Sequence, residues 1–357
     1  MLIFFGLVLF VLLVVVHEYG HLIAAKKGGV EVEEFGIGFP PRAKVLTKKN
    51  GTEYTLNWLP LGGFVKLKGE HDAATEKGSF GAASLPRKAW ILAAGVLMNW
   101  VAAAVIFTIV ALIGMPQLID NQFKIASDAR TMRQEVFAGY IEPNSPAEKN
   151  GIQQGDRILS LNNVDVKSGQ QLRSITKAEA GKSIAVTFSH SGHTQTKQVT
   201  LRNDPEKGNF GVAPGEQTLI RSTWSAPIVG VGTTAQFTWA TLEGLGGAVG
   251  NLFAGRASEA GQAVTGPVGI VVVLKDLAKH GLVFVLFLIG VISVSLAVMN
   301  VLPIPALDGG RLFVLALFRL LKKPLSKELE EKIHGTGMLV LLALAAVITV
   351  VDIKRFF

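Results

Sequence analysis

The chain of 357 residues contains no cysteine. Disulfide bonds, thiolate metal sites and a cysteine nucleophile are therefore excluded, and any bound metal must be held by imidazole and carboxylate groups. Charged residues make up only 17% of the chain, against about 25% in a typical soluble protein. Since 49% of the residues are hydrophobic and the mean hydropathy is +0.40, a membrane protein is the first class to consider.

Four apolar segments approach the roughly 17–25 residues that a helix needs to cross a bilayer. They are Leu2–Ala25, Ala89–Gly114, Leu282–Leu302 and Thr336–Ile353. The first segment lacks the basic start and the small-residue cleavage site of a signal peptide, so we expect it to be retained as a helix. The sequence thus predicts a polytopic α-helical membrane protein with four transmembrane helices.

The net charge of +8 reflects basic residues in the loops beside these segments. Lysines and arginines crowd residues 26–88 and recur in residues 311–327. The positive-inside rule places both regions in the cytoplasm and both termini outside, with Lys354 and Arg355 as a mild exception. No RNA- or DNA-binding motif accompanies the basic residues, so we expect no nucleic-acid partner.

A soluble insert, Phe123–Gly215, separates the second apolar segment from the third and is predicted to lie outside. Short alternating runs, Ile158–Leu161 and Ile184–Phe188, indicate strands separated by turns. The stretch Gly139–Val166, with its sequence SPAEKNGIQQGDRILSLN, resembles a bacterial PDZ domain. Such domains bind extended peptides or chain ends at the edge of a sheet.

The segment Thr218–Gly281 is rich in glycine and alanine. A fifth span within Ile228–Phe253 is disfavoured by Glu243 and by several glycines, so the segment is predicted to be amphipathic and to lie on the membrane surface. The predicted domains are residues 1–118 (two transmembrane helices and a cytoplasmic-side β-hairpin), 119–217 (PDZ domain), 218–281 (membrane-surface segment) and 282–357 (transmembrane helices three and four).

The sequence His17-Glu18-Tyr19-Gly20-His21 is an HExxH motif inside the first apolar segment. Four residues apart on a helix, the two imidazoles lie on one face and can bind one metal ion. Glu18 lies about 100° round the helix, where it can accept a proton from a water molecule that attacks a carbonyl group. The motif also occurs by chance, but ionisable groups near the bilayer centre cost roughly 2.5–3.5 kcal/mol each, which favours a functional role.

A catalytic zinc site usually has three protein ligands and one open position. The candidate for the third ligand is Asp308, in the sequence NVLPIPALDGG of residues 300–310. The prolines and glycines of this stretch could equally form a turn in which Asp308 caps a helix. Topology favours the metal, because the first and third segments both run from outside to inside and bring Asp308 to the membrane depth of His17 and His21.

These two motifs, in this order, resemble the site-2 protease family of intramembrane zinc metalloproteases. With its insert, the chain is similar to the bacterial group of regulator of sigma-E proteases, here with a single PDZ domain. The family pattern has HExxH in the first span and NxxPxPxLDG in the third, and both are intact. The likeness extends to Gly36–Glu70, which resembles the family's membrane-associated β-hairpin, and to Thr265–Ile270.

The resemblance implies that His17, His21 and Asp308 bind Zn²⁺ and that Glu18 is the catalytic base. It further implies a set of substrate-binding residues: Asn300, Pro303, Pro305, Tyr54, Gly62 and Gly63. The hairpin would pair with the substrate as an added strand, because a helix must be unwound before its peptide bonds can be attacked. Asn300 could instead serve helix packing.

The expected function is hydrolysis of peptide bonds in or near the transmembrane segments of single-span membrane proteins, such as anti-sigma factors or remnant signal peptides. Cleavage would usually follow a first cut by another protease. The expected location of the chain is the lipid bilayer of the bacterial cytoplasmic (inner) membrane. One alternative is a catalytically inactive scaffold that presents a PDZ domain, which would have no need of Glu18. The other, a transporter, is disfavoured by four spans without an internal repeat.

Overall fold

The computed structural model describes residues 1–119, 121–190, 192–204, 208–256, 259, 261 and 265–357. The chain forms two compact units, one of Met1–Val110 with Ala226–Phe357 and one of Ala111–Ser225. The second unit extends beyond the predicted range 119–217 at both ends. Its two connecting segments bind each other, since the Ser222 N–H donates to the Ala111 carbonyl oxygen at 2.8 Å.

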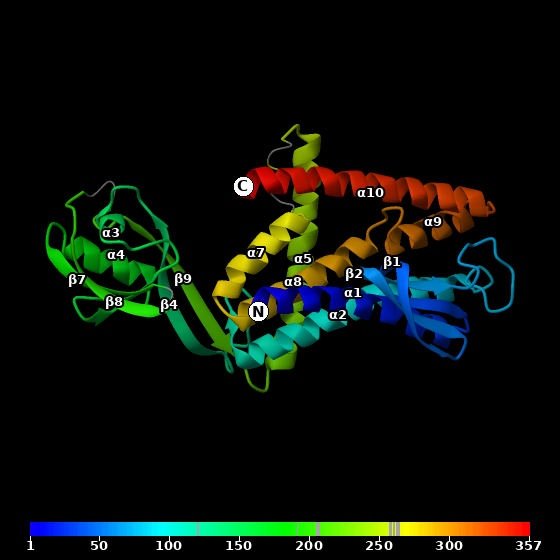
Figure 1. The fold of residues 1–357 in the computed structure, drawn as a ribbon, viewed down its shortest axis with the longest axis horizontal. Helices are drawn as coiled ribbons and strands as arrows, with labels where there is room; N and C mark the ends of the chain where they lie inside the picture. The colour runs from blue at the N-terminus through cyan, green and yellow to red at the C-terminus, as the bar shows by residue number, and fades with distance from the viewer. Residues whose placement is uncertain (120, 191, 205–207, 257–258, 260, 262–264) are drawn as a thin grey trace. The chain divides into compact units, whose positions relative to one another are not determined.

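The first unit contains the four helices among the described residues that are long and apolar enough to cross a membrane. They are α1 (Leu2–Lys27), α2 (Leu85–Ile113), α8 (Leu282–Val301) and α10 (Lys327–Phe356), and they contain the four predicted segments almost completely (Figure 1). Apolar side chains lie exposed on their outer faces, for example Phe4 at 74% and Leu339 at 69%. Such faces suit lipid rather than water.

The described part of this unit contains three further helices, α5 (Ala226–Phe253), α7 (Pro267–Lys279) and α9 (Asp308–Leu320). The Phe237 ring of α5 packs 5.8 Å from Phe107 of α2 and 5.5 Å from Phe287 of α8. The predicted surface segment 218–281 is thus largely helical, and the first half of α5 packs against two of the long helices. Part of that segment, at residues 257–258, 260 and 262–264, lies outside the described residues.

The predicted hairpin is a sheet of two long strands, β1 (Val32–Lys49) and β2 (Thr52–Leu67), that curls on itself. Both strands bend near prolines, Pro40–Pro41 in β1 and Pro60 in β2. Residues 34–37 of β1 therefore pair with residues 63–66 on one side and with residues 53–56 on the other. The end of β2 consequently forms an outer edge of the sheet.

Charged side chains anchor the loop that follows this sheet to the helices. Lys88 of α2 is fully buried and forms an ion pair with Asp72, which also pairs with Arg319 of α9 at 3.2 Å. Arg311 of α9 binds Glu70 at 2.8 Å. Such buried charges require their partners, because an unpaired charge in a dry interior is strongly destabilising. The pairs therefore fix β2 and α9 relative to each other.

In its described residues, the second unit is an antiparallel sheet with two short helices, α3 (Pro146–Lys149) and α4 (Gly169–Ala178). Its strands follow the order β3-β9-β4-β5-β7-β8, with β6 paired to β5. Their bounds are β3 (Met115–Pro116), β4 (Arg130–Ile141), β5 (Arg157–Leu161), β6 (Val164–Asp165), β7 (Ser183–His190), β8 (His193–Thr200) and β9 (Val212–Arg221). The two runs predicted as strands fall in β5 and β7, where Leu161, Ile184 and Phe188 form part of the buried core.

Candidate metal centre

Three side-chain donors converge at the contact between α1 and the start of α9. The Nε2 atoms of His17 and His21 lie 3.1 Å apart. The Oδ2 atom of Asp308 lies 3.1 Å from the first and 3.2 Å from the second. Both imidazoles are buried. The structure thus brings together the three residues that the two motifs singled out, although 287 positions separate His21 from Asp308 (308 − 21).

Local backbone geometry explains how Asp308 reaches α1. Helix α8 ends at Val301, and the following turn places Ala306 at φ +82°, a left-handed conformation that is uncommon without glycine. Gly309 and Gly310 lie directly against backbone carbonyl groups of this turn, where a Cβ atom would clash. The proline- and glycine-rich sequence therefore folds the chain back so that α9 begins with Asp308 at the two histidines.

The donor set fits a zinc ion. Bonds of about 2.0–2.1 Å in tetrahedral geometry put ligand atoms roughly 3.3 Å apart, close to the separations of these three atoms. The Asp308 Oδ2 atom is buried and has no hydrogen-bond donor of its own in the described structure. Within the described residues, this is the group of histidine, aspartate and glutamate side chains whose positions suit a metal ion.

Glu18 lies between these donors and the edge of the curled sheet. Its carboxylate lies near the backbone N–H of Val65 in β2. A Cβ atom added to Gly63 would lie 3.4 Å from Glu18 Cγ, so the glycine brings the strand close to the carboxylate. Residues 63–67 pair with β1 along one edge, and no described strand pairs with the other.

The predicted substrate-binding residues occupy different surroundings. Gly63 lies at the outer edge beside Glu18, and Gly62, at φ +132°, lies against the Phe39 ring. Tyr54 lies in the inner part of the sheet, paired with Phe35 and Thr47. Asn300 donates from Nδ2 to the carbonyl oxygen of Leu296 in its own helix, at 3.0 Å. Pro303 is exposed, and Pro305 packs against Gly337 of α10.

Helix α2 supplies neighbours of the metal centre that the sequence analysis did not identify. The Ile91 carbonyl oxygen lies 2.8 Å from His21 Nδ1, and the Asn99 amide lies 3.2 Å from His17 Nδ1. Gly95 lies between them, so close that a Cβ atom would contact both imidazoles. The signal in the sequence was a lone asparagine inside an apolar span, four residues after a glycine.

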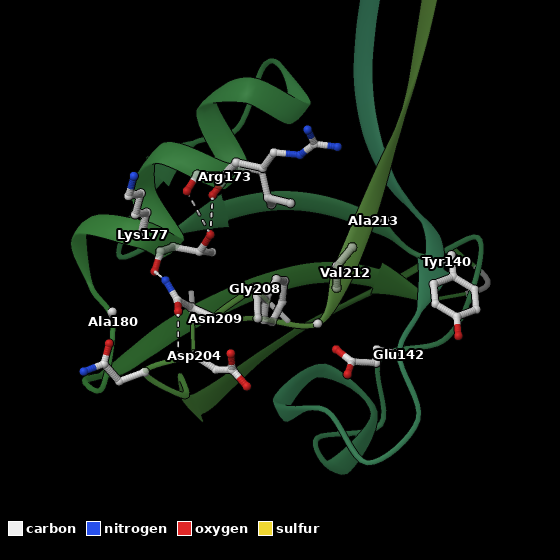
Figure 2. A pocket seen from close by; sticks show the side chains of 15 residues that line it. Tyr140, Glu142, Arg173, Lys177, Ala180, Asp204, Gly208, Asn209, Val212 and Ala213 are labelled. Carbon is white, nitrogen blue, oxygen red and sulfur yellow. Dashed lines mark hydrogen bonds between the residues drawn. The ribbon is translucent and has the colours of Figure 1, made fainter. Parts of the chain in front are cut away.

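The second unit contains a groove of about 740 Å³ between α4 and the start of β9. Figure 2 shows Arg173 and Lys177 on the helix side and Val212 and Ala213 on the strand side. Residues 212–215 of β9 pair with β4 along one edge, and in the described part of the chain no strand covers the other. An extended peptide could pair with this edge.

Three features indicate a metallopeptidase of the membrane-embedded class. They are the membrane-length helices, the buried His₂Asp donor set, and the Glu18 carboxylate beside a strand edge that no described strand covers. Residues 5–344 match the family model described as Peptidase family M50. The chain belongs to this family, the site-2 proteases. It is a zinc metalloprotease and an integral membrane protein, as the sequence analysis predicted.

Several curated relatives span the whole chain. One is a Clostridium perfringens protein that is provisionally named a zinc metalloprotease. It is 32% identical to this chain, and the alignment covers 99% of this chain and 98% of the relative. Zinc metalloprotease RasP of Geobacillus kaustophilus is 26% identical over 98% and 97% of the two chains. Zinc metalloprotease RasP of Shouchella clausii is 28% identical over 98% of each.

One solved structure resembles part of the chain. It is the PDZ domain of the SdrC-like protein of Listeria monocytogenes, with 18% identity and a TM-score of 0.21. The match covers 26% of this chain and 93% of that one.

Proposed function

We propose that the chain hydrolyses peptide bonds within or next to the transmembrane segments of single-span membrane proteins. In this proposal His17, His21 and Asp308 hold the zinc ion and Glu18 is the catalytic base. The supporting observation is the convergence of three metal donors within a unit of membrane-length helices. A protease for soluble substrates would have no use for a site among apolar helices.

The chain's own residues divide the chemistry between them. When bound, zinc acts as a Lewis acid toward the scissile carbonyl group and acidifies water at its open position. Glu18 accepts the proton of the attacking water and then delivers it to the nitrogen of the departing amine. The Val65 N–H lies near this carboxylate, and the helical spacing of the motif keeps Glu18 out of the ligand set.

The free edge at residues 63–67 receives the substrate as an added strand. A substrate helix shields its peptide bonds, and an unwound segment in lipid must have its backbone groups paired. The edge supplies these partners beside Glu18. Gly62 and Gly63 permit close approach of the substrate backbone, whereas Tyr54, with both neighbours paired, supports the sheet from within.

The site acts on substrates that resemble anti-sigma factors or signal-peptide remnants, after another protease has removed their outer portion. The family resemblance supports this order. The basic loops support an orientation in which the metal centre lies toward the cytoplasm and the second unit lies outside. The chain then resides in a bacterial cytoplasmic membrane with both termini outside.

Zinc analysis and cleavage of a model single-span protein by purified variants test the assignment. Glu18→Gln should retain zinc and lose roughly 10²–10⁴-fold in cleavage rate, whereas His21→Ala and Asp308→Ala should lose both. Glu243→Gln is the matched control, because this exposed glutamate of α5 binds only Trp239 in the described structure, at 2.6 Å. Full cleavage by Asp308→Ala, or loss of zinc from Glu18→Gln, would contradict the assignment.

The same assay separates the protease from a non-cleaving scaffold. If the protein were a scaffold, the wild type and the Glu18→Gln variant would bind the model substrate equally well. Neither of them would release fragments. Release of fragments by the wild type alone excludes that alternative.

A further inference from the structure

We infer that Asn99 of α2 is a positioning residue for the proposed zinc site, which selects the tautomer of His17 through its side-chain carbonyl oxygen. The inference rests on the proposed ligand set and adds a residue to it. Asn99 is 1% exposed, although it lies in a long run of mostly apolar residues in α2. Burying an amide in such a helix is costly, so a buried asparagine there indicates a structural or functional role.

A neutral imidazole can bind zinc through Nε2 only if its other nitrogen, Nδ1, carries the hydrogen. For His21 the backbone decides this, because the Ile91 carbonyl oxygen at 2.8 Å accepts a hydrogen bond and cannot donate one. His21 therefore carries its hydrogen on Nδ1, and Nε2 presents a lone pair toward Asp308 and His17. Metal-binding histidines commonly have such an acceptor behind them.

For His17 the partner of Nδ1 is the Asn99 side chain, whose Nδ2 atom lies 3.2 Å away. A half-turn of the amide exchanges its NH₂ group for its oxygen at this contact, with almost no change in the shape of the side chain. If NH₂ faces His17, the hydrogen of the imidazole is on Nε2, which then cannot bind a metal. If Oδ1 faces His17, Nδ1 donates and Nε2 is free for zinc.

The surroundings of Asn99 permit the second orientation. Its Oδ1 atom is buried without a hydrogen-bond partner in the described structure, so no donor holds it away from His17. The backbone at this position is fixed by α8, because the buried Ser293 hydroxyl donates to the Asn99 carbonyl oxygen at 2.7 Å. Ile91, Gly95 and Asn99 are spaced by four residues and share one face of α2. This face orients both imidazoles.

Zinc affinity of the purified full-length chain, measured by competition with a chromophoric chelator, tests the inference. Asn99→Leu keeps the approximate volume and removes the acceptor, and it should weaken zinc binding roughly 10–100-fold. Asn99→Asp restores an acceptor that cannot donate, and it should recover at least most of the affinity. Thr108→Val, a change from polar to apolar on the same helix, is the matched control and should bind zinc like the wild type.

A second measurement reads the tautomer directly. In the zinc-loaded wild type, ¹⁵N spectra of histidine-labelled protein should show the hydrogen of His17 on Nδ1, assigned by comparison with His17→Ala. If Asn99→Leu fails to fold, this spectrum and the affinities of Asn99→Asp and Asn99→Ala still decide the question. Wild-type affinity in Asn99→Leu or Asn99→Ala, equal losses in Asn99→Asp and Asn99→Leu, or hydrogen on Nε2 would overturn the inference. A wild type that binds no zinc would instead contradict the proposed site.

Discussion

Gly95 of α2 leaves the space in which His17 meets its partner ligands: a Cβ atom at position 95 would lie 2.8 Å from His17 Nε2 and closer still to His21. The absence of a side chain thus determines how near α2 can approach α1. An HExxH helix alone cannot show this requirement, since it concerns a residue in another helix.

We therefore expect Gly95→Ala to displace one or both imidazoles and to lower zinc affinity roughly 10–100-fold. The rate of substrate cleavage should fall as well. Gly244→Ala in α5 provides the control, because no described atom lies within 4 Å of a Cβ atom there. That change should leave zinc binding intact and stabilise the helix by roughly 0.5–1 kcal/mol. Chelator competition and thermal unfolding measure the two effects. Equal zinc affinity in both variants would show that the close approach at Gly95 is not required.

Much of the fold and of the candidate site follows from local patterns in the sequence. Long apolar runs predicted α1, α2, α8 and α10, and helical spacing predicted that His17 and His21 share a face. Asp308 could be proposed as a ligand because proline and glycine residues end the helix after a predicted span. The positive-inside rule then predicted that this helix end lies at the same membrane depth as His17 and His21.

Other features depend on long-range packing and could not be predicted in this way. The curl of β1 and β2 arises from two bends that pair one strand with both halves of the other, so Tyr54 lies inside the sheet and Gly63 at its edge. The position of α5 depends on the packing of Phe237 against aromatic rings of two helices that are distant in sequence. The contact of Asn99 with His17 depends on how α1 and α2 cross.

The proposed strand addition predicts a cross-linking pattern with a period of two residues. In a Glu18→Gln background, a cysteine at Lys66 should form disulfides with alternate positions of a substrate whose cysteine is moved one residue at a time, because an extended strand alternates its faces. The chain has no cysteine of its own, so each cross-link has a single origin. A cysteine at Lys49, on the opposite side of the sheet, is the control and should form none. Cross-links at every third or fourth position would mean that the substrate stays helical at this edge.

The proposed orientation predicts opposite accessibility for two tight turns. Lys48 lies exposed near the turn between β1 and β2, and Asn163 lies exposed between β5 and β6. Cysteines at these positions should react differently with a membrane-impermeant thiol reagent in cells with a permeable outer layer. Position 163 should be labelled in intact cells and position 48 only after lysis. Labelling of position 48 in intact cells would reverse the orientation.

The final prediction concerns the second unit, which we propose acts as a size filter for substrates without taking part in the chemistry. A folded module of about 100 residues has a radius of gyration near 13 Å. Outside the membrane, it would obstruct substrates that keep a bulky outer domain and admit trimmed ones. The hydrogen bond between Ser222 and Ala111 brings the ends of the unit together, so a short glycine-serine linker can replace residues 115–221.

This deletion should leave cleavage of a short-tailed substrate largely intact and should permit cleavage of the full-length one. The charge-reversed variant Arg173→Glu/Lys177→Glu keeps the bulk of the unit but changes its groove, so it should still exclude the full-length substrate. Fragment yields from the two substrates in all three proteins decide between steric exclusion and docking. If the deletion variant binds zinc but no longer cuts the short substrate, the unit is a required docking site. If the groove variant admits the full-length substrate as the deletion does, recognition in the groove rather than size controls entry.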